Sequence, residues 1–136
     1  MALVADASIV LAWAFEEAFP DAEATLRRIR NEQIVVPTLW WFEIRNVLVL
    51  KEGFGRWTPD RTALFLSVLA QLAIRLDGAP QEAAVLDLAR RHHLTVYDAA
   101  YLELAIRERL PLATLDRALR EAARAEAISV IASNRP

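Results

Sequence analysis

The stretch LTVYDAAYLELAIRERLPLATLDRAL, from Leu94 to Leu119, contains the pattern that decides the fold. Its first half has the apolar spacing of an amphipathic helix over Tyr97 to Arg109, and its second half predicts an apolar strand over Leu112 to Leu115. Asp98 opens this helix, and Asp116 follows the strand. A carboxylate beside buried structure costs free energy unless a partner or a metal ion stabilises it, so both acids need an explanation.

The rest of the chain repeats this alternation of apolar strands and helices. Further strands are predicted over Ala2 to Ala5, Ile34 to Val36, Ala73 to Leu76 and Ile128 to Ala132. Helices are predicted over Ile9 to Phe15 with Ser8 or Asp6 as its cap, Asp21 to Arg30, Thr38 to Glu52, Thr58 to Leu72, Pro80 to His92 and Arg117 to Arg124. Because the strands are apolar without alternation and are separated by helices, the pattern favours an α/β fold with a parallel sheet covered on both faces.

Composition indicates one domain over residues 1–136. The chain is 55% hydrophobic and 25% charged, and its longest uncharged run has 13 residues, between Arg61 and Arg75. A bilayer span needs roughly 18 to 20 residues, so we expect no membrane association. Asp6 lies inside the first apolar segment and no basic region precedes it, which excludes a secretory signal. The absence of cysteine fits a reducing compartment, and we expect a cytoplasmic protein.

The charged residues are nearly balanced, and almost all the cations are arginine. A net charge of −2 argues against binding of polyanions through the overall field of the protein. Arginine forks suit phosphate, although a high arginine content also follows from genomic composition. The candidates for phosphate contact are Arg27, Arg28, Arg30, Arg90 and Arg91.

Four of the 18 acids stand in apolar settings: Asp6, Glu43, Asp98 and Asp116. Asp6 and Asp116 each follow an apolar strand, and the carboxyl ends of parallel strands are where ligands bind in such sheets. Glu43 lies on a helical stripe with apolar neighbours at Leu39, Trp40, Val47 and Leu50. The remaining acids, Asp77 and Glu103 among them, are assigned to polar turns or solvated helix faces.

Each of the four acids also has an ordinary structural interpretation. Asp98 is explained equally well as a helix cap, and Asp6 and Asp116 as turn or cap residues. Glu43 is explained by an ion pair with Arg45, two residues further on, or with another arginine. These explanations become harder to hold together if all four acids lie at one edge of the sheet.

Clustered carboxylates repel one another, and a hard divalent cation with oxygen ligands offsets that repulsion. Mg²⁺ or Mn²⁺ fits this donor set better than a softer metal, because the chain has 2 His and no Cys. His92 and His93 end an arginine-rich helix and are interpreted as surface or cap residues. A carboxylate-bound cation of this kind suits hydrolysis of a phosphodiester, so the four acids favour a nuclease.

At these residues the sequence resembles PIN-domain ribonucleases, in particular VapC-type toxins of type II toxin–antitoxin modules. The motifs that carry the resemblance, spread from end to end of the chain, are VADAS with Asp6 and Ser8, FEIRNVL with Glu43 and Asn46, VYDAAYLELA with Asp98 and Tyr101, and LATLDRAL with Thr114 and Asp116. The resemblance implies a three-layer α/β/α sandwich with a central parallel sheet of four to five strands. It implies that Asp6, Glu43, Asp98 and Asp116 hold Mg²⁺, with Ser8, Thr114 and Asn46 in support.

The same resemblance implies an endoribonuclease toxin that cleaves RNA and is silenced by a cognate VapB-type antitoxin. It also implies a homodimer, and a higher assembly with the antitoxin. An excess of apolar residues agrees with such interfaces: Trp40, Trp41, Phe42, Phe54, Trp57 and the segment from Leu64 to Leu72. The alternative is that all of these residues belong to the core.

Two other functions remain open. A PIN nuclease that matures cellular RNA has the same acids, and the presence or absence of a neighbouring antitoxin gene separates it from a toxin. A non-catalytic signalling or interaction domain is the third possibility. A phospho-accepting receiver relies on a lysine near its last strand, and the single lysine here, Lys51, lies in a predicted helix.

Overall fold

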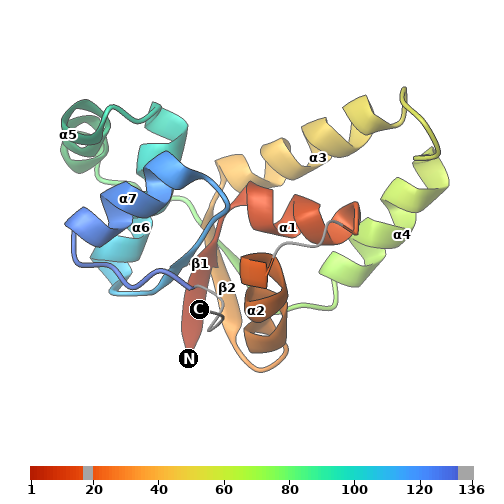
Figure 1. Cartoon of the computed structure of the whole chain (residues 1–136), viewed down its shortest axis with the longest axis horizontal. Helices are drawn as coiled ribbons and strands as arrows, with labels where there is room; N and C mark the ends of the chain where they lie inside the picture. Colours follow the sequence, from red (N-terminus) through yellow and green to blue (C-terminus); the bar gives the residue numbers. More distant parts are fainter. Residues whose placement is uncertain (17–19, 132–136) are drawn as a thin grey trace.

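The computed structural model describes residues 1–16 and 20–131, and a parallel four-stranded sheet forms its centre (Figure 1). The strands lie in the order β3-β2-β1-β4. Their bounds are Ala2–Ala5 for β1, Gln33–Pro37 for β2, Ile74–Asp77 for β3 and Leu112–Ala113 for β4. β1 pairs in parallel with β2 and β4, and β2 pairs in parallel with β3, so the predicted parallel sheet is confirmed.

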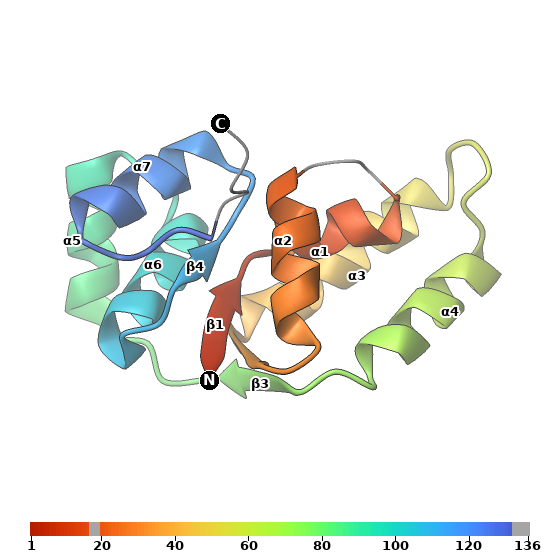
Figure 2. The same cartoon turned by 60° about the horizontal axis from the view of Figure 1, so that its bottom comes forward.

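Helices cover both faces of this sheet. Figures 1 and 2 show α5, α6 and α7 gathered on one side and α1, α2, α3 and α4 on the other. The helices are α1 Ala7–Ala14, α2 Pro20–Ile29, α3 Leu39–Lys51, α4 Pro59–Leu69, α5 Glu82–His92, α6 Val96–Glu108 and α7 Arg117–Ala125. The fold is therefore the three-layer α/β/α sandwich that was predicted. None of the helices described here has the length and apolar character needed to cross a bilayer.

The predicted strands near the carboxyl end of the chain are shorter than expected. β4 ends at Ala113. Beyond it, the backbone N–H of Asp116 donates a hydrogen bond to the side chain of Thr114 (2.9 Å), so the ladder does not continue. The strand predicted from Ile128 reduces to an isolated bridge between Leu112 and Val130, and Ala132 lies outside the described residues.

Several helix ends also differ from the sequence prediction by a few residues, and one predicted cap bond does not form. α6 begins at Val96 rather than at Tyr97, because the side chain of Thr95 caps it by accepting the N–H of Asp98 (3.0 Å). α4 ends at Leu69, short of Leu72. Thr38 precedes α3, but its side chain makes no capping hydrogen bond.

α6 contains the longest unbroken run of buried residues in the described chain, and one acid inside it corrects the sequence prediction. Every residue from Ala99 to Ala105 is buried, including Glu103, which is only 3% exposed and not on a solvated face. The carboxylate of Glu103 accepts hydrogen bonds from the guanidinium of Arg107 (2.7 Å) and from the backbone N–H of Gln81 (3.1 Å). These charge-assisted bonds offset the cost of burying the acid.

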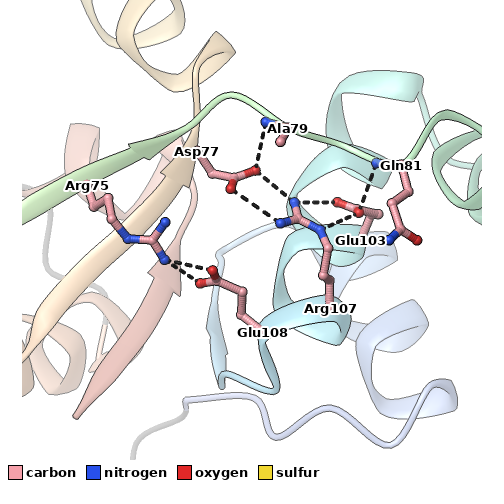
Figure 3. Close-up of polar contacts among 7 residues, drawn as sticks. All are labelled: Arg75, Asp77, Ala79, Gln81, Glu103, Arg107 and Glu108. Atoms are coloured by element: carbon pink, nitrogen blue, oxygen red, sulfur yellow. Dashed lines mark hydrogen bonds and ion pairs between the residues drawn. The ribbon is translucent and has the colours of Figure 1, made fainter.

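The same arginine joins α6 to the end of β3. Arg107 also pairs with Asp77 (2.7 Å), whose side chain is 10% exposed, so Asp77 is not a free turn residue either. Nearby, Arg75 pairs with Glu108 (2.5 Å), and Figure 3 shows these groups side by side. The network fixes the helix against the edge of the sheet and holds the segment that leads into α5.

We predict that Glu103→Gln lowers the free energy of unfolding by about 1–3 kcal/mol, because it weakens the charge-assisted bonds that satisfy a buried group. Urea denaturation followed by circular dichroism measures this loss. Glu121→Gln is the matched control, since its ion pair with Arg117 is exposed and such pairs contribute about 0–1 kcal/mol. Equal stability of the two variants would contradict the role assigned to Glu103.

Candidate active site

The carboxylate of Asp6 lies at the carboxyl end of β1 and is 5% exposed. One of its oxygens caps α1 by accepting the N–H of Ile9 (3.3 Å) and also accepts the hydroxyl of Ser8 (2.5 Å). The other oxygen accepts the hydroxyl of Thr114. Asp6 is therefore the cap of the first helix, as one of the two predicted alternatives, and both of its oxygens are bonded.

The two hydroxyls bonded to Asp6 also connect the first strand to the last. Ser8 Oγ accepts the backbone N–H of Leu115 (3.0 Å), and Thr114 Oγ1 accepts that of Asp116 (2.9 Å). Each hydroxyl thus donates to the carboxylate and accepts from the backbone. The ends of β1 and β4 are held together around one buried acid.

Asp98 and Asp116 come from the starts of two helices. Asp98 is half-buried in the first turn of α6, and Asp116 is the exposed N-cap of α7, where it accepts the N–H of Leu119 (2.9 Å). The partial positive charge of a helix N-terminus favours a carboxylate at either position. From Asp6 through Asp98 to Asp116 the side chains become progressively more accessible, so the site opens to solvent beside α7.

Glu43 reaches the site from α3 and is held by a tyrosine of α6. Its carboxylate is half-buried and accepts the hydroxyl of Tyr101 at 2.6 Å. Tyr101 itself is 1% exposed. The alternative that Arg45 neutralises Glu43 is wrong, because Arg45 stacks over the ring of Trp41 (3.9 Å) and forms no ion pair with Glu43.

Electrostatic coupling links the four acids through Asp98. The pKa of Asp6 is raised from 3.8 to about 6, chiefly by burial and to a smaller extent by the charge of Asp98, against the lowering effect of its hydrogen bonds with Ser8, Thr114 and Ile9. Burial and then Asp98 likewise raise the pKa of Glu43. The pKa of Asp98 is raised first by burial and then by Asp116. Asp98 therefore lies within electrostatic reach of the other three carboxylates.

The donor set suits a hard divalent cation in its chemistry. All four groups are carboxylates, and the burial that raises the pKa of Asp6 is a cost that a bound cation would offset. In the described part of the chain, no three acidic or histidine side chains lie close enough together to hold one ion as they stand. The carboxylates are thus near neighbours whose oxygens do not yet converge on a single point.

The other predicted site residues are dispersed. Asn46 is exposed and lines a surface hollow with Glu43. Three of the arginines proposed for phosphate contact lie near the end of α2, which leads into the amino end of β2, at the edge of the sheet opposite Asp6: Arg27, Arg28 and Arg30. Arg28 pairs there with Glu32 (2.8 Å).

The remaining predicted residues lie at the end of α5. Arg90 is exposed, whereas Arg91 pairs with Asp87 (2.8 Å) and Glu126 (2.9 Å). His92 also contacts Glu126 (3.0 Å), and His93 ends the helix in the left-handed conformation. The structure thus gives both histidines the surface or cap roles that were predicted, and it does not gather the arginines into one patch.

Two partners of the acids were not predicted as such. Tyr101 was named only as part of the motif VYDAAYLELA, yet its hydroxyl is the hydrogen-bond donor to Glu43. A buried tyrosine hydroxyl usually finds a partner, and that was the available signal. Thr95 was also missed, although a threonine three residues before an acid is a known helix-start pattern.

The sequence profile of the PIN domain matches residues 3–125, so the chain belongs to the PIN domain family. A search of curated protein sequences finds no significant match. Solved structures similar to this chain include PAE2754 from Pyrobaculum aerophilum, with 28% sequence identity, a TM-score of 0.65, and coverage of 90% of this chain and 87% of that one.

Two further similar structures come from toxin–antitoxin systems. A chain of the toxin–antitoxin complex from Klebsiella pneumoniae is 21% identical, with a TM-score of 0.56 and coverage of 84% of this chain and 86% of that one. A chain of VapBC2 from Rickettsia felis, bound to a DNA fragment from their promoter, is 12% identical, with a TM-score of 0.67 and coverage of 96% and 97%. These likenesses agree with the fold that the resemblance to VapC-type PIN domains implies.

We predict that Asp6→Asn removes a pH-dependent loss of stability measured in the presence of a chelator. A folded-state pKa of about 6, above the ordinary 3.8, means that the folded protein binds the proton more tightly than the unfolded chain. The wild type therefore loses stability relative to the variant as pH rises from about 4 to about 6.5, by up to about 3 kcal/mol at about 1.4 kcal/mol per unit of pKa.

Urea denaturation at a series of pH values measures the difference between the two curves. Glu121→Gln, which removes an exposed carboxylate on α7, is expected to follow the wild type. Parallel curves for Asp6→Asn and the wild type would show that the pKa of Asp6 is not raised in the folded protein. That result would contradict the effect assigned to its burial.

Proposed function

We propose that this PIN domain is a metal-dependent endoribonuclease and the toxin of a type II toxin–antitoxin system. The observation that supports the proposal is that Asp98, at the start of α6, lies within electrostatic reach of Asp6, Glu43 and Asp116, which come from three other segments. A structural cap or turn explains any one of these acids. It does not explain why the pKa values of three of them are raised by their neighbours or their burial.

The proposed cofactor is Mg²⁺, with Mn²⁺ able to replace it. The residues proposed to hold it are Asp6, Glu43, Asp98 and Asp116, whose oxygens are the ligands that these cations prefer. A bound divalent cation supplies a water of lowered pKa and neutralises charge on a phosphoryl oxygen. RNA cleavage requires the phosphate to approach four acids, and the same cation offsets their mutual repulsion.

The surrounding residues orient the acids. Ser8 and Thr114 hold both oxygens of Asp6, and Tyr101 holds Glu43. Groups that orient a metal ligand in this way typically change affinity or activity by about 10- to 100-fold when they are removed. Asp98 and Asp116 are the more accessible pair, so they are the acids that an incoming phosphate meets first.

The second part of the proposal is a protein partner, and we propose that this partner is a cognate VapB-type antitoxin. Two similar structures come from toxin–antitoxin complexes, which supports this role. A hollow of about 570 Å³ between α1, α3 and α4 is lined by aromatic and aliphatic side chains, with cations at Lys51, Arg56 and Arg61. We assign this hollow to a protein interface, with the antitoxin or in a homodimer.

A housekeeping PIN nuclease for RNA maturation is the alternative function. It shares the carboxylates and the cation, so the active site does not distinguish the two. A short neighbouring reading frame for a DNA-binding antitoxin, together with growth arrest on expression, would identify the protein as a toxin. Normal growth and the absence of such a reading frame decide for the housekeeping enzyme.

We predict that the purified protein cleaves single-stranded RNA in Mg²⁺ or Mn²⁺ and stops when a chelator is added. Asp6→Asn and Asp98→Asn each lower the cleavage rate by more than about 100-fold, because even orienting residues cost about 10- to 100-fold. Glu121→Gln, the exposed acid on the helix that Asp116 caps, keeps the wild-type rate. Gel analysis of a labelled RNA provides the rates. Full activity in Asp98→Asn would contradict the assignment of Asp98 to the metal site.

A second prediction concerns metal binding without any RNA. Millimolar Mg²⁺ raises the melting temperature of the wild type, because the ion binds the assembled carboxylates and not the unfolded chain. The shift is largely lost in Asp98→Asn and kept in Glu121→Gln. Differential scanning fluorimetry measures it, and a wild type with the same melting temperature in Mg²⁺ and in chelator would argue against a metal site here.

A further inference from the structure

An exposed aromatic pair lies directly before Glu43 on α3. Trp41 and Phe42 are 41% and 68% exposed, and their rings meet edge to face with centroids 5.0 Å apart. Arg45 lies over the ring of Trp41 at 3.9 Å and donates to the Trp41 carbonyl oxygen (3.1 Å). We call Trp41, Phe42 and Arg45 the aromatic platform.

The platform shares one hollow with an acid of the active site. A surface depression of about 560 Å³ is lined by Trp41, Phe42, Glu43, Arg45, Asn46 and Val49. Glu43 therefore borders the same space as Phe42. A ligand seated on the platform lies beside Glu43 without having to displace any described side chain.

The charge of Arg45 is available to a ligand. Among residues 1–16 and 20–131, no carboxylate lies within ion-pair distance of this guanidinium, unlike those of Arg28, Arg75, Arg91, Arg107, Arg117 and Arg120. Guanidinium planes and aromatic rings are the groups on which proteins stack unpaired bases. The platform combines both beside a phosphate-directed site.

We propose that the aromatic platform binds a base of single-stranded RNA next to the cleaved phosphate. This inference rests on the proposed nuclease function and names how the same site holds its substrate. A polyanion approaching four carboxylates is repelled, and the net charge of −2 gives no compensating field. Stacking of a base on Phe42 is a neutral interaction, so the carboxylates do not oppose it.

A second protein chain is the competing occupant of this surface. A protein seated over the hollow buries the carboxylate of Glu43 further, and that costs free energy unless the partner neutralises it. The separate hollow of about 570 Å³ beside α4 offers a comparable apolar surface away from the four acids. The observations therefore favour RNA at the platform, and a subunit interface becomes an outcome of the test.

Two substitutions of Phe42 separate stacking from apolar contact. Phe42→Leu keeps an apolar side chain but removes the π-face, whereas Phe42→Trp keeps a ring. Phe54→Leu is the control, because Phe54 is 70% exposed and lies beyond the end of α3, roughly 14 Å or more along the helix from Phe42. All three changes are exposed and leave the buried core untouched.

Binding is measured on the catalytically inactive Asp6→Asn background by fluorescence anisotropy of a labelled 12-nucleotide single-stranded RNA of random sequence. Phe42→Leu is expected to raise Kd by about 5- to 100-fold, the range for loss of one base–aromatic stack, while Phe42→Trp and Phe54→Leu stay within about 2-fold. Phe42→Leu leaves the salt dependence of Kd unchanged. Arg45→Gln lowers the slope of log Kd against log salt by about 0.7.

In chains that keep Asp6, Phe42→Leu raises KM for RNA with little change in kcat. The proposal is overturned if the Asp6→Asn chain binds no RNA, or if Phe42→Leu binds as the parent does. It is also overturned if Phe42→Leu halves the mass measured by analytical ultracentrifugation, because the face is then a subunit interface. A wild type that binds RNA through Phe42 yet cleaves none refutes the nuclease function and leaves the platform standing.

Discussion

The burial of the Asp6 carboxylate between the ends of β1 and β4 is the constraint on which the site depends. A charge at this position has to recover the solvation that it loses, and the hydroxyls of Ser8 and Thr114 supply part of it. Those hydroxyls also accept backbone N–H groups beyond β4, so the same bonds join the first and last strands. The ladder with β1 holds the short β4, and these side-chain bonds hold the segment that follows it.

The buried position of α6 helps to fix where the other acids lie. Tyr101 points to Glu43 on α3, while Glu103 and Arg107 tie the other side of the helix to Gln81 and to Asp77 at the end of β3. The rotation and position of α6 are thus fixed by polar contacts on more than one side. Asp98, one turn before Tyr101, is placed near the remaining carboxylates as a consequence.

The sequence predicted the parts of the structure that depend on local pattern. The alternation of apolar strands and helices gave the parallel sheet. The apolar settings of Asp6, Glu43, Asp98 and Asp116 selected four acids that are linked electrostatically through Asp98. Glu103 was misassigned because helical periodicity does not reveal that α5 and its preceding segment cover that face of α6. The bond from Tyr101 to Glu43 spans 58 residues of sequence, so no local pattern predicts it. The arginines were likewise indistinguishable by type, and only the fold separates paired Arg91 from unpaired Arg45.

Four acids at one edge of a sheet serve RNA chemistry only if a cation brings their oxygens to a common centre. A crystal structure with bound Mn²⁺ tests this claim directly, because anomalous scattering locates the ion independently of the protein atoms. The account predicts an anomalous peak among the carboxylates of Asp6, Asp98 and Asp116, with Glu43 directed toward it and the bonds from Ser8 and Thr114 to Asp6 kept. A peak elsewhere on the protein, or none at saturating Mn²⁺, would contradict it.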